Sequence, residues 1–137
     1  MSRLARANAV GRFAMDNKLP TILVIEDDEP TRAFVAAALS DEGYAVVSAG
    51  DADEGAQLAQ QCSPSLILLD LLMPRGGGMR FLDAYREHGA ELAPVVVMTA
   101  ASDYERLEIR TLADGVLAKP FELDDLIGVV QRFCRPG

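Results

Sequence analysis

Leu66-Ile67-Leu68-Leu69-Asp70 is the stretch that decides the fold, because four consecutive aliphatic residues run directly into an acid. Three further apolar runs behave similarly: residues 22–25 lead into Glu26 and Asp27, residues 95–98 into Thr99, and residues 116–118 into Lys119. Short unbroken apolar runs are typical of strands in a parallel sheet that is buried on both faces. Ligands bind at the carboxyl ends of such strands. The sequence therefore predicts that these polar residues share one rim of one sheet.

Strand patterns alternate with helix patterns along the chain. The expected strands span residues 21–26, 44–48, 65–69, 94–98 and 116–118, and the expected helices span residues 30–42, 52–61, 79–88, 103–112 and 122–133. Pro30 suits a first helical turn, Asp51 suits an N-cap, and residues 74–78 contain four helix breakers, which predicts a loop. This order predicts an α/β fold, a flavodoxin-like (βα)5 doubly wound parallel sheet with strand order 2-1-3-4-5.

Length and composition fit one globular domain. The chain has 137 residues, of which half are hydrophobic and a quarter are charged. No stretch predicts a membrane span, no signal peptide is evident, and a net charge of −8 argues against a broad nucleic-acid surface. We therefore expect a cytoplasmic protein in which Cys62 and Cys134, whose spacing fits no metal motif, stay reduced.

Residues 1–18 differ from the rest of the chain. They carry a net charge of +3, whereas the remaining residues carry −11. We expect a flexible N-terminal extension, followed by one domain over residues 19–137, and Met15 is an alternative start. A weaker hypothesis is that this basic segment folds back on the acidic site or assists binding to a partner or a membrane surface.

The residues at the predicted rim suit phosphoryl chemistry. Glu26, Asp27 and Asp70 would repel one another unless a cation balanced them, and Mg²⁺ prefers carboxylate and phosphate oxygens. Asp70 is a candidate nucleophile for an aspartyl phosphate, Lys119 would neutralise phosphoryl oxygens, and Thr99 would donate a hydrogen bond. Each residue alone has an ordinary structural explanation, such as a helix cap or a surface lysine. Four strand ends carrying these types together favour the phosphoryl site.

The same motifs resemble the receiver domain of two-component response regulators over about residues 19–133. ILVIEDDEPTR resembles the family's first strand and acidic pair, LILLDLLMP its phosphoacceptor segment, VVVMTA its threonine segment and AKPF its lysine segment. The resemblance implies that Asp70 is phosphorylated. It also implies a Mg²⁺ (or Mn²⁺) site formed by Asp27, Asp70 and the backbone carbonyl of Leu72, with Glu26 as the second acid acting through water.

The resemblance further implies that Thr99 and Lys119 contact the phosphoryl group and that the Lys119–Pro120 peptide is cis. The function so implied is a phosphorylation-dependent switch in a two-component or phosphorelay system, rather than an enzyme with a separate substrate. The donor would be a histidine kinase or a histidine phosphotransfer protein, and the target an unidentified protein. We expect a stand-alone receiver that is a monomer or a weak phosphorylation-dependent dimer, without direct contact to nucleic acid.

Several positions depart from the family pattern. Val116 stands where the family usually has Tyr or Phe, and residues 99–119 are about two residues shorter than is common, so a phosphorylation-independent binding or adaptor module is the alternative function. A dehalogenase-type phosphatase is disfavoured, because Leu72 stands where such enzymes place a second acid. Leu72 and Ala101 cannot orient a water molecule, which predicts slow loss of phosphate from Asp70.

Overall fold

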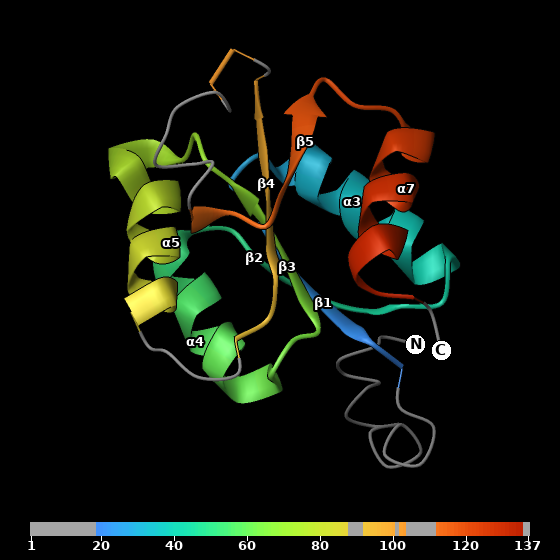
Figure 1. Ribbon diagram of the computed structural model, residues 1–137, viewed down its shortest axis with the longest axis horizontal. Coiled ribbons are helices and arrows are strands. Elements are labelled where there is room, and N and C mark those ends of the chain that lie inside the picture. The colour runs from blue at the N-terminus through green and yellow to red at the C-terminus, as the bar shows by residue number, and fades with distance from the viewer. Residues whose placement is uncertain (1–18, 88–91, 101, 104–111, 136–137) are drawn as a thin grey trace.

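Figure 1 shows the computed structural model of the protein, in which a five-stranded parallel sheet lies between two layers of helices. The structure describes residues 19–87, 92–100, 102–103 and 112–135. The strands lie in the order β2-β1-β3-β4-β5, and every neighbouring pair is parallel. Their bounds are β1 (Thr21–Ile25), β2 (Ala45–Ala49), β3 (Leu66–Asp70), β4 (Val95–Ala100) and β5 (Gly115–Lys119). The predicted flavodoxin-like fold and strand order are therefore confirmed.

Helices cover both faces of the sheet. α3 (Glu29–Asp41) and α7 (Leu123–Phe133) lie on one face, and α4 (Ala52–Cys62) and α5 (Gly77–Glu87) lie on the other (Figure 1). Side chains alternate between these layers along each strand, as the pleat requires: Ile22 and Val24 belong to one core cluster, and Leu23 belongs to the other. β3 is buried along its whole length. The central strands therefore form a fixed platform for whatever follows their carboxyl ends.

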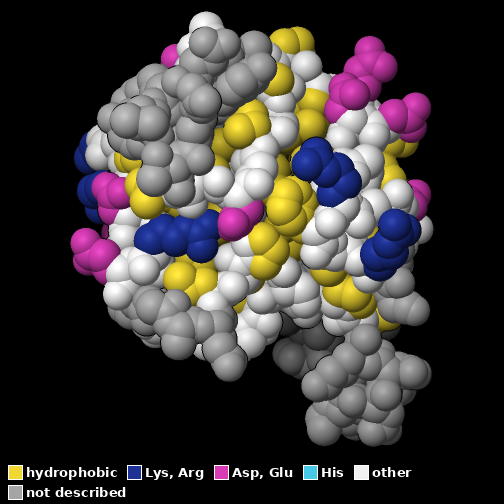
Figure 2. Space-filling view, viewed as in Figure 1, with side chains coloured by type: hydrophobic (Ala, Val, Ile, Leu, Met, Phe, Trp, Pro, Cys, Tyr) yellow, Lys and Arg dark blue, Asp and Glu magenta, His cyan; other side chains and the backbone are white. Residues whose placement is uncertain are grey.

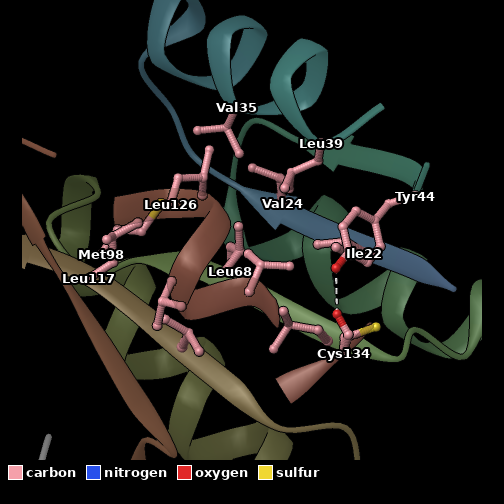
Figure 3. Close-up of a cluster of buried hydrophobic side chains, with 14 residues drawn as sticks. Ile22, Val24, Val35, Leu39, Tyr44, Leu68, Met98, Leu117, Leu126 and Cys134 are labelled. Carbon is pink, nitrogen blue, oxygen red and sulfur yellow. Dashed lines mark hydrogen bonds between the residues drawn. The ribbon is translucent and has the colours of Figure 1, made fainter. Parts of the chain in front are cut away.

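The core under α3 and α7 ends in a buried polar contact. In Figure 3, the hydroxyl of Tyr44 points to the residue after α7 and donates a hydrogen bond to the backbone oxygen of Cys134. This contact ties the start of β2 to the end of α7. Cys62 is half-buried and Cys134 is buried, and neither forms a disulfide among the described residues.

Edge strand β5 is less buried than the central strands. Figure 2 shows this side of the molecule, where hydrophobic side chains lie in a band over β5 and α7. Val116, the residue at the usual aromatic position, is half-buried and packs against the core cluster on the α4 and α5 side. No helix in the described part of the chain is long and apolar enough to cross a membrane.

The helix starts agree with the predicted caps, with one addition. Asp51 caps α4 by accepting a hydrogen bond from the backbone N–H of Glu54 at 2.8 Å, as predicted. α3 begins with Pro30 in its first turn, and Asp28, which the sequence analysis did not identify as a cap, accepts from the Thr31 N–H at 3.1 Å. The cis Lys119–Pro120 peptide is also confirmed.

The predicted loop over residues 74–78 is too long. Residues Pro74–Gly76 form a 3₁₀ turn, and α5 begins at Gly77. A Cβ built on Gly78 would lie 2.5 Å from the backbone oxygen of Leu71 and 2.7 Å from that of Asp70. The second half of this glycine run therefore allows a helix to pack closely against the end of β3, rather than breaking the helix. The expected helix over residues 103–112 and the N-terminal extension over residues 1–18 lie almost wholly outside the described residues.

We expect Gly78→Ala to lower the free energy of unfolding by about 1–3 kcal/mol, because its Cβ has no room against the backbone of Leu71. Gly128→Ala is the matched control, since Gly128 is exposed within α7 and a Cβ there meets no atom within 4 Å. That control should raise stability by about 0.5–1 kcal/mol through helix propensity. Urea unfolding measures both, and equal effects of the two substitutions would contradict the packing argument.

Candidate functional site

Strand register brings the predicted site residues to one rim. Asp70 at the end of β3 pairs with Met98 of β4, so Thr99 lies one residue beyond that pair. Lys119 at the end of β5 pairs with Ala100. Glu26 follows β1 directly, and its N–H donates to the backbone oxygen of Ala49 at 3.0 Å. The carboxyl ends of β1, β3, β4 and β5 thus carry the residues that the sequence analysis selected, on the side of the sheet where α/β proteins bind ligands.

Three carboxylates form a cluster at this rim. Glu26, Asp27 and Asp70 each present one oxygen such that these oxygens lie within 4.8 Å of one another. Glu26 and Asp70 are buried, with 0% and 3% of their surfaces exposed, whereas Asp27 is exposed. Like charges at this distance, two of them shielded from water, suit a hard divalent cation with one side open to solvent. The cluster therefore has the donor set for Mg²⁺ that the sequence predicts.

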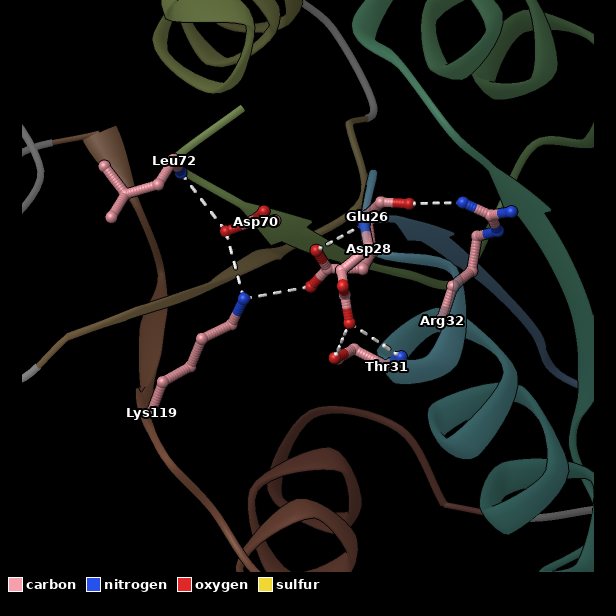
Figure 4. A network of polar contacts seen from close by, with 7 residues as sticks. All are labelled: Glu26, Asp28, Thr31, Arg32, Asp70, Leu72 and Lys119. Atoms are coloured by element: carbon pink, nitrogen blue, oxygen red, sulfur yellow. Dashed lines mark hydrogen bonds and ion pairs between the residues drawn. The ribbon is translucent and has the colours of Figure 1, made fainter. Parts of the chain in front are cut away.

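Lys119 bridges two of the acids. Its Nζ donates to Glu26 Oε1 at 3.0 Å and to Asp70 Oδ1 at 3.2 Å (Figure 4). Burial alone would lower the pKa of Lys119, but hydrogen bonds and attraction from Glu26 and Asp70 outweigh it and raise the pKa above its usual value. The ammonium is therefore charged at neutral pH and balances part of the negative cluster. The sequence predicts the lysine at the rim but not its bridge between the two acids.

Glu26 titrates far from its ordinary range. Burial, followed by a hydrogen bond with Asp70, raises the pKa of Glu26 from 4.5 to about 7, and the hydrogen bond from Lys119 opposes this rise. The backbone N–H of Asp28 also donates to Glu26 Oε2 at 3.1 Å. Burial therefore favours the protonated form of Glu26 when no cation balances the cluster.

The hydroxyl of Thr99 is buried and has no hydrogen-bond partner among the described residues. Its surface is 1% exposed, and its Oγ1 is the one buried side-chain nitrogen or oxygen without a hydrogen bond among the described residues. A buried hydroxyl left unpaired costs about 1–3 kcal/mol, so such atoms call for an explanation. Thr99 lies beside Asp70 on the neighbouring strand, which makes an oxygen-rich ligand at Asp70 a fitting partner.

Leu72 follows Asp70 by two residues and contacts it through its backbone. Its backbone N–H donates to Asp70 Oδ1 at 3.1 Å, and 65% of its surface is exposed. Its side chain brings no hydrogen-bonding atom to the mouth of the site. Ala101, the second position expected to influence phosphate lifetime, lies outside the described residues.

The start of α3 adds contacts that the sequence analysis missed. The Asp28 carboxylate accepts from the hydroxyl and the N–H of Thr31, and these bonds lower the pKa of Asp28. Arg32 Nη1 donates to the backbone oxygen of Glu26 at 2.7 Å. An Asp two residues before a helical Pro is a recognisable N-cap signal. No comparable sequence signal pairs Arg32 with the backbone of Glu26.

Fold and site together define a class: a flavodoxin-like α/β protein with a lysine-bridged acidic site at the carboxyl edge of its sheet. The family model of the response regulator receiver domain matches residues 22–131. The chain therefore belongs to the response regulator receiver domain family of two-component signalling, as the resemblance indicated.

Individual relatives agree with this family. The chain is 37% identical over 114 residues to the transcriptional regulatory protein PdtaR of Mycobacterium tuberculosis, covering 80% of this chain and 54% of that protein. It is 35% identical over 112 residues to the transcriptional regulatory protein DltR of Streptococcus agalactiae, covering 80% of this chain and 50% of that protein. The chain thus spans about half the length of the curated relatives it matches.

Solved structures share the fold over nearly the whole domain. The chemotaxis response regulator CheY4 of Vibrio cholerae superposes with a TM-score of 0.77 at 29% identity, covering 85% of this chain and 99% of that chain. NtrX from Brucella abortus, solved in complex with ATP, has a TM-score of 0.73 at 35% identity and covers 82% of this chain and 26% of that chain.

We expect the stability of the metal-free protein to depend on pH through Glu26. The raised pKa means that the native state holds this proton more tightly than the unfolded chain does. The resulting stabilisation is complete below the unfolded pKa of 4.5, decreases as the pH rises, and is lost above the folded pKa of about 7.

The side chain of Glu26→Gln cannot ionise. The free energy of unfolding of the wild type should therefore fall by about 1–3 kcal/mol relative to that of this variant between about pH 5 and about pH 8. Urea unfolding of both proteins in a chelator measures the difference, in which contributions from other titrating groups largely cancel. A difference that is the same at both pH values would show that Glu26 titrates normally.

Proposed function

We propose that this receiver domain accepts a phosphoryl group on Asp70 and signals through the resulting change at the sheet rim. The observation that carries this proposal is the unpaired, buried hydroxyl of Thr99 beside Asp70 and Lys119. A phosphoryl group on Asp70 supplies oxygens that can accept from both Thr99 and Lys119. A rim with only a structural role gains nothing from a buried hydroxyl that lacks a partner.

The acidic cluster fits Mg²⁺ or Mn²⁺ by the chemistry of its donors. Asp27, Asp70 and the backbone carbonyl of Leu72 would hold the ion directly, with Glu26 as the second acid. When bound, the ion neutralises charge on the phosphoryl oxygens and on the carboxylates. A hard cation with an open side at Asp27, the exposed member of the cluster, leaves room for an incoming phosphoryl group.

The residues of the chain then have separate tasks. A carboxylate oxygen of Asp70 attacks the phosphorus of a phosphohistidine, and the imidazole of the donor leaves as the P–N bond breaks. Lys119 exchanges a carboxylate partner for a phosphoryl oxygen. Thr99 gains the acceptor that it lacks before phosphorylation. The donor is a histidine kinase or a histidine phosphotransfer protein, and the switch acts on a protein target rather than on a substrate of its own.

Incubation with acetyl phosphate and Mg²⁺ should add one phosphoryl group, about 80 Da, to the wild-type protein. Asp70→Asn should gain nothing, because it removes the nucleophile. Asp83→Asn, an exposed acid on α5, should gain the group as wild type does. Intact mass spectrometry measures all three.

No gain in folded wild-type protein with Mg²⁺ present would overturn the proposal. The phosphorylation-independent adaptor would then be the better reading, and Val116 on β5 would be its first distinguishing feature. A gain that persists in Asp70→Asn would place the phosphoryl group elsewhere.

We expect the phosphoryl group on Asp70 to persist, because the exposed side chain of Leu72 cannot orient an attacking water. Leu72→Asn places an amide at the same mouth and should shorten the lifetime several-fold. Leu72→Met is the control, since it keeps an apolar side chain of similar size. The decay is followed by intact mass after the donor is removed, and equal lifetimes for Leu72→Asn and wild type would contradict this role.

A further inference from the structure

We infer that Arg32 is a positioning residue that holds the acidic turn after β1 in the geometry needed for the divalent cation. This inference rests on the proposed function of the same site. Arg32 lies in the first turns of α3, outside the acidic cluster itself. Its role follows from what its guanidinium contacts and from the direction in which its charge acts.

The guanidinium binds the backbone rather than a carboxylate. Arg32 Nη1 donates to the carbonyl oxygen of Glu26 at 2.7 Å. Figure 4 shows Arg32 on the opposite side of Glu26 from Lys119. The N–H of Glu26 still continues the hydrogen-bond pattern of the sheet by donating to Ala49, whereas the carbonyl of Glu26 is no longer part of that pattern. Arg32 therefore binds the first peptide oxygen of the turn that leads from the sheet into α3.

That peptide group joins two members of the cluster. The carbonyl of Glu26 and the N–H of Asp27 belong to one planar unit, so fixing the oxygen fixes the direction in which the chain enters Asp27. Asp27 is exposed and gains no support from burial. The next residue, Asp28, is held separately by Thr31 at the start of α3. Arg32 thus constrains the part of the turn that the helix cap does not.

The neighbouring turn leaves space for this arginine. A Cβ built on Gly50 would lie 3.1 Å from Arg32 Nη1, so the guanidinium lies against a residue without a side chain. The N–H of Gly50 donates to Glu54 Oε1 at 3.0 Å, which holds this turn in place at the start of α4. Gly50 therefore leaves room for the guanidinium at this position.

Through its charge alone, Arg32 would weaken Mg²⁺ binding, whereas in its proposed positioning role it strengthens Mg²⁺ binding. A positive charge near a cation site weakens cation binding, so removal of Arg32 should tighten Mg²⁺ binding if charge alone mattered. Positioning predicts weaker binding, because the cluster would lose its preorganisation. The sign of the change therefore separates the two roles.

The test is the Mg²⁺ dependence of phosphorylation by acetyl phosphate, measured on the full chain. For Arg32→Met we expect the half-saturating Mg²⁺ concentration to rise about tenfold, as is usual when a residue that orients metal ligands is removed. The rate at saturating Mg²⁺ should stay within about twofold of wild type, because Arg32 contacts none of the reacting groups. Arg32→Lys should also weaken Mg²⁺ binding, since an ammonium does not reproduce the planar guanidinium.

Arg80→Met is the matched control, because Arg80 is exposed on α5 and its loss changes the net charge equally. Its half-saturating Mg²⁺ concentration should equal that of wild type. Direct Mg²⁺ titration by calorimetry, with folding verified by circular dichroism, gives the same comparison without phosphorylation.

The outcomes separate this inference from the proposed function. Tighter or unchanged Mg²⁺ binding in Arg32→Met, with wild type active, would overturn the positioning role alone. A wild-type protein that neither binds Mg²⁺ nor accepts a phosphoryl group would instead overturn the proposed function. Loss of the saturating rate without a change in Mg²⁺ dependence would also contradict positioning.

Discussion

Repulsion between carboxylates at one rim of the sheet is the constraint on which the arrangement of the candidate site depends. Each pair among Glu26, Asp27 and Asp70 has oxygens within 4.8 Å. At an effective dielectric constant near 20, two unit charges at that distance repel by about 3–4 kcal/mol, which is larger than the net contribution of a typical hydrogen bond. The cluster is therefore stable only with added positive charge or a proton. Lys119 provides the first, and burial of Glu26, which raises the pKa of its carboxyl group, favours the second.

The fold holds this cluster through buried apolar contacts rather than through the polar residues themselves. β3 is buried along its whole length, and β1 has four buried residues before Glu26. Close packing fixes where those strands end, since such interiors tolerate little displacement. Gly78 brings the start of α5 against the backbone of Asp70 and Leu71. The rim can therefore hold mutually repelling carboxylates close together, because the tightly packed strands beneath it allow little movement.

The sequence predicts the features that depend on local pattern. It does not predict the features that depend on contacts between residues far apart in the chain. Apolar runs predict the central strands and the polar residues at their ends, and the position of Asp51 before a helical pattern predicts its role as a cap. The sequence pattern predicts a loop at Gly77 and Gly78, because a glycine needed for close packing looks the same in a sequence as one that breaks a helix. Arg32 was missed because its partner is a backbone oxygen, which carries no sequence signal.

The two hydrogen-bond donors at the rim, Lys119 and Thr99, differ in how many partners they have. This difference bears on how a switch at this site would work. Within the described part of the chain, Lys119 has two carboxylate partners, whereas the hydroxyl of Thr99 has no hydrogen-bond partner. A phosphoryl group on Asp70 would accept a hydrogen bond from Thr99 and compete with Glu26 for Lys119. The new hydrogen bond would then form at β4, whereas the exchange of partners would take place at β5. Val116 on β5 is a half-buried aliphatic residue with no hydroxyl or large ring to reorient, so that rearrangement would act through the backbone and packing of the edge strand. Signalling would then depend on small shifts of β5 against β4, rather than on one side chain changing its rotamer.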